Sequence, residues 1–218
     1  MPIISQFNYL KEIYKLEQQS LEVSVSKLAK MLKVSQPSVT QQLRALTNRK
    51  LVSWKPRSSI QLTPKGEKYA IDLIRKHRII ESFLVQILDF NPLQAHIEAE
   101  ELEHLASQHF VEGLLKLCGH PQYDPHGDPI PSKEGKFPQQ HNYLPLSKLK
   151  DGQTSKIAAI SESNHKLLQT MMDKKLCIGG KIQKTNTQNE FLFNDKVIQL
   201  NTAQVQAIFL KEEKHGAN

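Results

Sequence analysis

The chain has 218 residues, of which 39% are hydrophobic and 23% charged, and its formal net charge is +7. This composition excludes a disordered tail and predicts one large domain or two modest ones, each with a core. No apolar run reaches the roughly 18 residues of a membrane span, and charge begins too early for a secretory signal. Two cysteines are too few for a disulfide framework, so we expect a reducing, cytoplasmic location.

The charge is unevenly distributed along the chain. Residues 1–89 hold 15 Lys and Arg against 7 Asp and Glu, whereas residues 90–120 hold 1 against 5. A basic N-terminal part suits a polyanionic partner, although an ordinary solvated surface has the same composition. The fold that presents the charge must decide between the two interpretations.

The first 50 residues predict a helix followed by a helix-turn-helix. Apolar residues recur at helical spacing from Tyr9 to Leu16. We expect Ser26 to cap a short second helix, and Ser35 to cap a third one, with Pro37 in its first turn. Along the third helix Val39, Leu43 and Leu46 should face inward. This leaves a polar outer face, which is typical of a recognition helix.

Residues 51–66 predict a two-stranded hairpin, or wing, with a basic tip. Lys55 and Arg57 in this tip are placed to contact phosphates. Helix pair, wing and local basic charge together favour DNA binding over a three-helix packing module without DNA. The expected DNA-contacting residues are Ser35, Gln36, Pro37, Ser38, Thr40, Gln41, Arg44, Lys55 and Arg57.

Two long helices should follow, over residues 63–88 and 92–117. His77 and Glu81 share one face of the first because they are four residues apart. The second carries HIEAEELEH, in which His96, Glu100, Glu103 and His104 should form one stripe. Carboxylates gathered on one face repel each other, and a divalent cation would turn that repulsion into coordination.

Imidazole and carboxylate ligands without a thiolate suit Mn²⁺, Fe²⁺, Co²⁺, Ni²⁺ or Zn²⁺. A plain charged face with two stray histidines is the alternative. Carboxylate and histidine stripes also build di-iron enzymes, but those use Glu-x-x-His motifs from two helices. The chain also lacks GxSxG, phosphate-loop and HExxH motifs, so we expect no enzyme.

The C-terminal part predicts a small β-domain. Residues 119–146 are rich in Pro, Gly and His and should form a loop, with His120, His126 and His141 on the surface. Short apolar strands follow over residues 155–161, 177–184, 190–194, 196–200 and 206–211, with one helix over 162–175. Several short strands with one helix indicate a small barrel.

The order of helix-turn-helix, wing, RKHRIIE, HIEAEELEH and HPQYDPHGDPIP resembles the diphtheria-toxin-repressor family over residues 4–131, and more weakly beyond. These are bacterial metal-dependent transcription regulators. The resemblance implies an ancillary metal site at His77, Glu81 and His96. It implies a primary site at Glu100, Glu103 and His104, completed by a residue of the first helix. A carboxylate at the position of Glu100 is typical of the manganese-sensing branch, whereas the iron-sensing branch has cysteine.

Asn8 stands where the family has an acid or a methionine, and a neutral amide is a weaker donor. Lys11 nearby would add repulsion if it faced the site. The alternative is therefore a protein that has drifted towards weak or altered metal control. The resemblance also implies a C-terminal SH3-like domain, which can contribute a ligand to the ancillary site, and Glu162 is the nearest residue for that role together with His165.

We therefore expect a mainly α winged helix-turn-helix domain (1–73), a helical metal-binding and dimerisation domain (74–140) and an SH3-like β-barrel (141–218). The expected function is a Mn²⁺- or Fe²⁺-dependent homodimeric regulator that binds double-stranded operator DNA. Repression of metal-uptake genes is favoured, and activation stays open. The alternatives are a metal-independent winged-helix regulator and a small carboxylate and histidine metalloenzyme.

Overall fold

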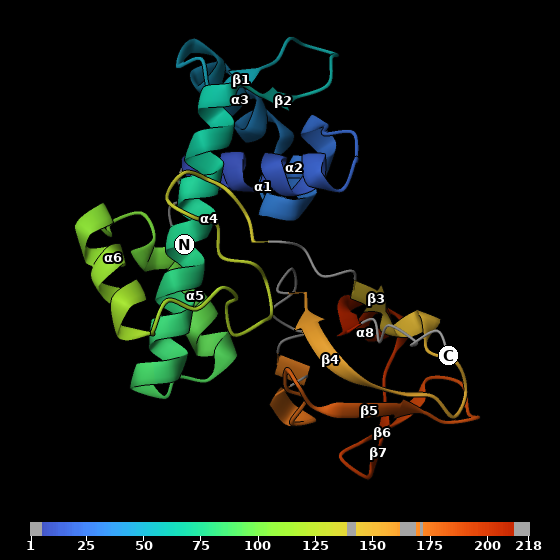
Figure 1. Cartoon of the computed structure of the whole chain (residues 1–218). Helices are drawn as coiled ribbons and strands as arrows, with labels where there is room; N and C mark the ends of the chain where they lie inside the picture. The colour runs from blue at the N-terminus through green and yellow to red at the C-terminus, as the bar shows by residue number, and fades with distance from the viewer. Residues whose placement is uncertain (1–5, 139–142, 162–168, 171, 212–218) are drawn as a thin grey trace, which may run out of the picture. The chain divides into compact units, whose positions relative to one another are not determined.

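The structure is a computed structural model, and it describes residues 6–138, 143–161, 169–170 and 172–211. Figure 1 labels its helices and strands. The chain divides into two compact units, which are described separately below. The first holds Met1–His77, Glu101–Ala106 and Pro131–Lys136, and the second holds Arg78–Glu100, Ser107–Ile130 and Phe137–Asn218.

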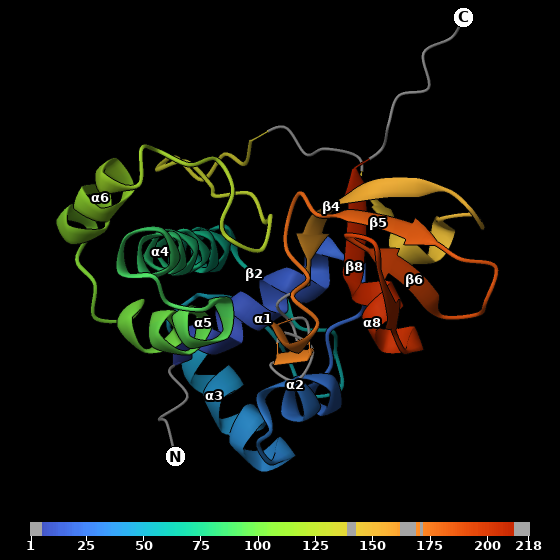
Figure 2. The ribbon, with the colours of Figure 1, turned by 90° about the horizontal axis from the view of Figure 1, so that it is seen from below.

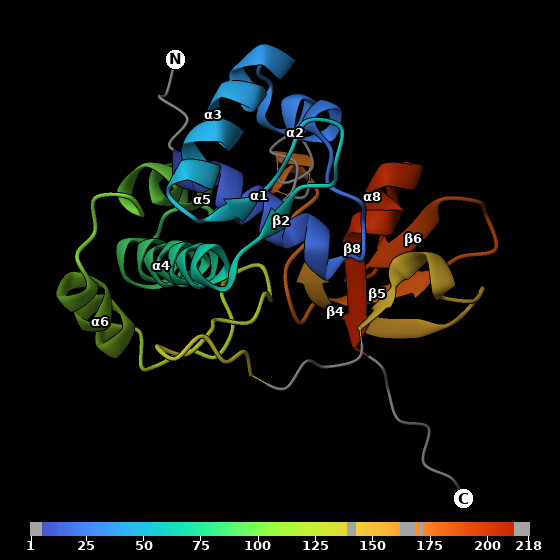
Figure 3. The same cartoon turned by 90° about the horizontal axis from the view of Figure 1, so that it is seen from above.

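The first unit begins with the expected three helices, α1 (Gln6–Gln18), α2 (Val25–Leu32) and α3 (Gln36–Asn48), seen from above in Figure 3. Apolar residues of α1 from Tyr9 to Leu16 are buried, as predicted. Ser35 caps α3 by accepting a hydrogen bond from the Ser38 amide. Ser26 is not the cap of α2, however, because Ser24 stands outside the helix in extended conformation and accepts from the Lys27 amide.

The wing consists of β1 (Val52–Ser53) and β2 (Gln61–Leu62), which pair antiparallel. It is anchored to α1, because the Leu62 amide donates to Glu17 Oε1 at 2.9 Å. The Ile60 amide also donates to the Val23 carbonyl at 3.1 Å. These bonds fix the base of the hairpin and leave its tip, residues 55–59, exposed. The predicted wing is therefore present.

Helix α4 (Pro64–Leu88) spans the 25 residues that the periodicity indicates. The prediction of a second long helix was wrong, because two helices form in its place, α5 (Pro92–Leu102) and α6 (Gln108–Leu117). The Ser107 side chain accepts a hydrogen bond from the Phe110 amide and so restarts the helix after a turn. Glu103 and His104 consequently lie in the turn rather than on a helical stripe.

The loop after α6 is irregular, as expected, and is tightly held. Asp124 Oδ1 accepts from the amides of His126 and Asp128, each at 2.9 Å. Arg78 of α4 donates to the Pro129 carbonyl at 2.6 Å and lies 3.4 Å from Asp124 Oδ2. The loop also joins the β-domain, since the Ile160 amide donates to the His126 carbonyl at 2.9 Å.

Six strands of the described chain form one antiparallel sheet in the order β3-β8-β4-β5-β6-β7, part of which Figure 2 shows. Their bounds are β3 (Tyr143–Pro145), β4 (Thr154–Ile160), β5 (Lys181–Lys184), β6 (Glu190–Phe193), β7 (Lys196–Gln199) and β8 (Ile208–Lys211). The short elements η1 (Leu146–Lys148) and α8 (Thr202–Ala207) accompany the sheet. Its buried core includes Ile157, Ile182, Phe191 and Ile208.

Three details of the β-domain differ from the sequence prediction. Strand β3 lies within the predicted loop, and β5 begins at Lys181, after the two glycines. The last strand begins only at Ile208, because Asn201 and Gln204 form a capping box that starts α8 before it. The predicted helix over 162–175 falls largely outside the described residues.

Gly127 is the position where the loop needs glycine. Its φ is +86°, and a Cβ there would lie 2.2 Å from the Ala158 carbonyl oxygen. Gly119 has a comparable φ of +72° but open space around it. We expect Gly119→Ala to lower the free energy of unfolding by about 1 kcal/mol, through backbone conformation alone. Gly127→Ala should cost about 1–3 kcal/mol more, through the clash with β4. Urea unfolding of both variants measures the difference, and equal losses would contradict this packing.

Candidate metal centre and nucleic-acid interface

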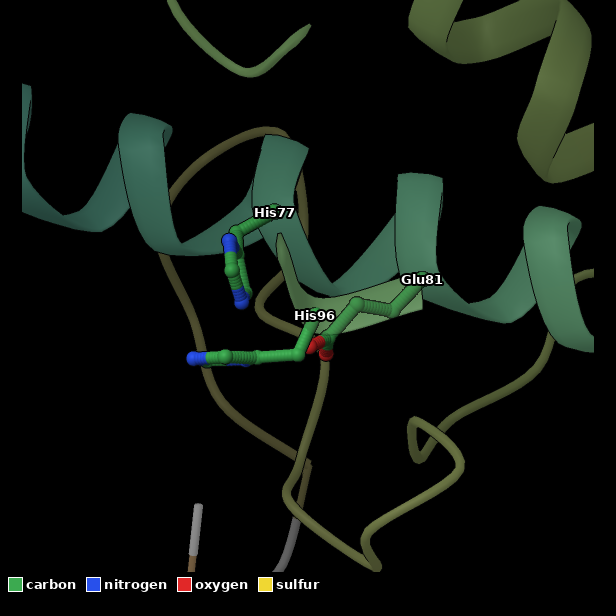
Figure 4. Close-up of side chains that lie close together, drawn as sticks. All are labelled: His77, Glu81 and His96. Carbon is green, nitrogen blue, oxygen red and sulfur yellow. The ribbon is translucent and has the colours of Figure 1, made fainter. Parts of the chain in front are cut away.

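Three buried side chains converge where α4 and α5 carry their histidines. His77 and Glu81 project from successive turns of α4, and His96 comes from α5, as Figure 4 shows. Each offers one ligand atom, and these atoms all lie within 4.8 Å of one another. The structure therefore brings together the residues of the predicted ancillary site. Two imidazoles and a carboxylate suit a divalent transition metal.

Carboxylates orient both histidines of this cluster. His77 Nδ1 lies 2.7 Å from Glu103 Oε2, and His96 Nδ1 lies 2.7 Å from Glu81 Oε1. A histidine ligand commonly has its second ring nitrogen held by a carboxylate, which fixes the ring and its tautomer. Glu103 holds the His77 ring in this way. Glu103 was predicted for the primary site, but its closest partner is therefore a histidine of the predicted ancillary site.

His126 is a buried neighbour of the cluster that the sequence interpretation placed on the surface. Only 3% of it is exposed, its Nε2 lies 3.6 Å from Glu81 Oε1, and its ring meets His96 edge-on. The surface prediction was therefore wrong for His126, although it is correct for His120. The sequence signal was Asp124, whose carboxylate folds the loop inward.

The residues of the predicted primary site are arranged differently. Glu100 lies 3.7 Å from His96 Nε2, measured from its Oε1, whereas Glu103 turns to α1. There Lys11 Nζ lies 2.8 Å and 3.1 Å from the two Glu103 oxygens. His104 stacks on Phe7 with ring centroids 6.4 Å apart. Within the described residues, Glu100, Glu103 and His104 do not form a cluster with metal-ligand spacing.

Glu103 is fully buried between two basic partners, His77 and Lys11. Burial raises the pKa of its carboxyl, but His77 and Lys11 lower it further, so that the pKa lies below its ordinary value. Asn8 is half-buried on α1, and its Oδ1 has no hydrogen-bond partner among the described residues. Glu162, the ligand expected from the C-terminal domain, lies outside the described residues.

The winged helix-turn-helix formed by α1, α2, α3 and the wing, called the reading head below, presents its predicted contact residues to solvent. On α3 and its cap Ser35, Gln36, Pro37, Ser38, Gln41 and Arg44 are exposed, whereas Thr40 is half-buried. Lys55 and Arg57 are exposed in the wing. Val39, Leu43 and Leu46 are fully buried, so the polar face of α3 is the one that faces outward. Among the described helices, none is both long and apolar enough to cross a bilayer.

The chain combines a winged helix-turn-helix with helices that carry a buried cluster of two histidines and a glutamate, and with a small β-domain. This combination places it in the class of winged-helix proteins that contain a metal site. Two family models match the chain. Residues 5–60 match the iron-dependent repressor N-terminal DNA-binding domain, and residues 63–132 match the iron-dependent repressor metal-binding and dimerisation domain. The chain belongs to the iron-dependent, or diphtheria-toxin, repressor family.

Among curated relatives, the diphtheria toxin repressor of Corynebacterium glutamicum is 32% identical over 123 residues, which are 56% of this chain and 54% of that protein. The iron-dependent repressor IdeR of Mycobacterium leprae matches with the same identity and coverage. The match thus spans about half the length of these relatives.

Solved structures match over nearly the whole chain. A manganese-dependent transcriptional repressor in complex with manganese has a TM-score of 0.84 at 28% identity, covering 96% of this chain and 100% of that one. ScaR with bound Zn²⁺ has a TM-score of 0.80 at 31% identity, with the same coverage. The similarity extends into the sheet, and the predicted fold class with a C-terminal SH3-like domain is confirmed.

Glu81 is the residue on which metal binding to the cluster should depend most. We expect Glu81→Gln, which keeps the shape of the side chain, to weaken Mn²⁺ binding at least about tenfold, since even partners of metal ligands contribute about 10–100-fold. Glu98→Gln removes the same charge from an exposed position of α5 and should leave binding unchanged. Calorimetric titration with Mn²⁺ measures both, and equal affinities would remove Glu81 from the site.

Proposed function

We propose that the chain is a homodimeric, metal-responsive DNA-binding regulator that represses metal-uptake genes. The observation that carries the proposal is the buried cluster of His77, Glu81 and His96 on helices that follow a winged helix-turn-helix. Metal-dependent repression is what the names of its relatives state for those proteins.

The cluster fits a divalent transition metal through its donor set. His77, Glu81 and His96 would hold the ion, and His126 lies beside them, with its Nε2 3.6 Å from the Glu81 Oε1. When bound, the ion supplies a positive charge that links α4 to α5. Mn²⁺ and Fe²⁺ are the proposed physiological ions because nitrogen and oxygen ligands suit both. Other divalent transition metals should bind in vitro.

DNA recognition is assigned to α3 and the wing. Gln36, Ser38, Gln41 and Arg44 are side chains that reach base edges and phosphates in a major groove. Lys55 and Arg57 extend the contact to the phosphate backbone. A twofold dimer presents two such heads, so the operator should be a double-stranded, roughly palindromic sequence.

Helix α4 gives the proposal a physical connection between metal and DNA. It starts at Pro64, directly after the wing, and carries His77 in the same continuous helix, about 20 Å further along at 1.5 Å per residue. Glu103 links His77 to Lys11 of α1 within the first unit. Metal and DNA should then raise each other's affinity by the same factor, as linkage requires.

The test is fluorescence anisotropy of a labelled duplex taken from upstream of the gene for this protein. Titrations run in chelator, with Mn²⁺, and anaerobically with Fe²⁺. We expect metal to raise DNA affinity at least tenfold, which is about 1.4 kcal/mol of coupling. Equal binding in chelator would favour the second candidate function, a metal-independent winged-helix regulator. The Lys11–Glu103 ion pair is the observation that supports this candidate.

Two exposed residues separate sequence recognition from backbone binding. Gln41→Ala should narrow the affinity gap between the operator and a scrambled duplex, because a side chain that reads base edges is lost. Arg57→Ala should weaken binding to both duplexes and lower the salt slope by about one charge. Anisotropy at several salt concentrations measures both effects. A uniform loss in the Gln41 variant would move recognition away from this face of α3.

A further inference from the structure

Lys11 and Glu103 form a buried ion pair at the place where the family resemblance puts a metal. Lys11 is 5% exposed and Glu103 is fully buried. Lys11 belongs to α1, whereas Glu103 follows the last residue of α5, so the pair connects the reading head to the turn before α6. Both Glu103 oxygens are within hydrogen-bond distance of the same ammonium group.

This pair removes the donors that a cation would need. A divalent ion on Glu103 would stand within a few ångströms of the Lys11 ammonium, and two positive charges at that distance in a buried site repel strongly. Removing the ammonium instead leaves a buried carboxylate with one partner fewer, which is also costly. Glu103 therefore has its positive charge supplied by the chain itself.

The chemistry of Asn8 supports the same conclusion. It lies three residues before Lys11 and so on the same face of α1. Its buried Oδ1 lacks a hydrogen-bond partner among the described residues, and its amide carries no charge. Glu100 lies beside His96 instead, with its Oε1 3.7 Å from the His96 Nε2. The remaining donors Asn8, Glu103 and His104 supply a single negative charge, which Lys11 neutralises. With the Lys11 ammonium in place, this donor set does not fit a divalent cation.

We propose that the Lys11 ammonium replaces the divalent cation at Glu103, so that each protomer takes up one divalent ion fewer than two intact sites would. The inference rests on the proposed function, because it leaves the cluster of His77, Glu81 and His96 as the place where metal acts. The connection between α1 and Glu103 is then permanent. Glu103 passes the state of the cluster to α1 through its contact with His77.

The test is the number of Mn²⁺ ions that the purified 218-residue chain retains, measured by elemental analysis alongside calorimetric titration. Lys11→Glu exchanges the ammonium for a carboxylate, and we expect it to bind one more Mn²⁺ per protomer than the unaltered chain. Lys15→Glu makes the same charge change on the same helix and should leave the number unchanged. Equal numbers for Lys11→Glu and the unaltered chain would overturn the proposal.

A second pair of variants covers the case in which Lys11→Glu does not fold. Lys11→Arg keeps the positive charge, whereas Lys11→Met removes it and keeps an unbranched side chain that is one atom shorter. In chelator, we expect Lys11→Met to bind a DNA duplex at least tenfold more weakly than Lys11→Arg, and added Mn²⁺ to close much of that gap. Equal affinities of the two variants in chelator, with circular dichroism showing both folded, would also overturn it.

These outcomes separate this inference from the proposed function. If the unaltered chain binds no Mn²⁺ and Lys11→Glu binds one, the proposed metal response fails while the replacement by Lys11 stands. If the unaltered chain binds two and its DNA affinity rises with Mn²⁺, the proposed function stands and the replacement is wrong.

Discussion

The buried carboxylate of Glu103 is the constraint on which the arrangement of the first unit depends. A fully buried negative charge is tolerated only when it is paired and hydrogen-bonded. Glu103 satisfies this with Lys11 from α1 and His77 from α4. Three segments far apart in the sequence are thereby held at one point. The lowered pKa of the Glu103 carboxyl expresses the same fact, because both partners favour its ionised form more than burial opposes it.

In the second unit, helix α4 holds segments that are far apart in the sequence. Arg78, the residue after His77, holds the loop of Asp124 and Asp128. That loop positions His126 beside Glu81 and joins strand β4 through its backbone. Consecutive residues of one helix therefore face two different networks. The cluster contacts both networks, through His77 and Glu103 in one case and through Glu81 and His126 in the other.

Local signals predicted much of this structure, and contacts between distant segments supplied the rest. Periodicity and caps predicted α1, α3, the wing and α4, because these depend on neighbouring residues. The spacing of His77 and Glu81 predicted their shared face, and the family resemblance added His96. The break between α5 and α6 was missed, although Ser107 is an ordinary cap residue, since helical apolar spacing continues across it. The burial of His126 and the pairing of Lys11 with Glu103 depend on tertiary packing, which no local pattern encodes.

A switch needs a cation that can leave, and this distinguishes the two predicted metal sites of the chain. An ammonium tethered to α1 is present at Glu103 whatever the metal concentration, so the occupancy of this position does not itself respond to metal supply. The cluster of His77, Glu81 and His96 offers two imidazoles and a carboxylate, and none of these three ligating groups is an ammonium. We therefore propose that the cluster, rather than Glu103, is the site that would sense metal, and that Glu103 would connect the cluster to the reading head through Lys11.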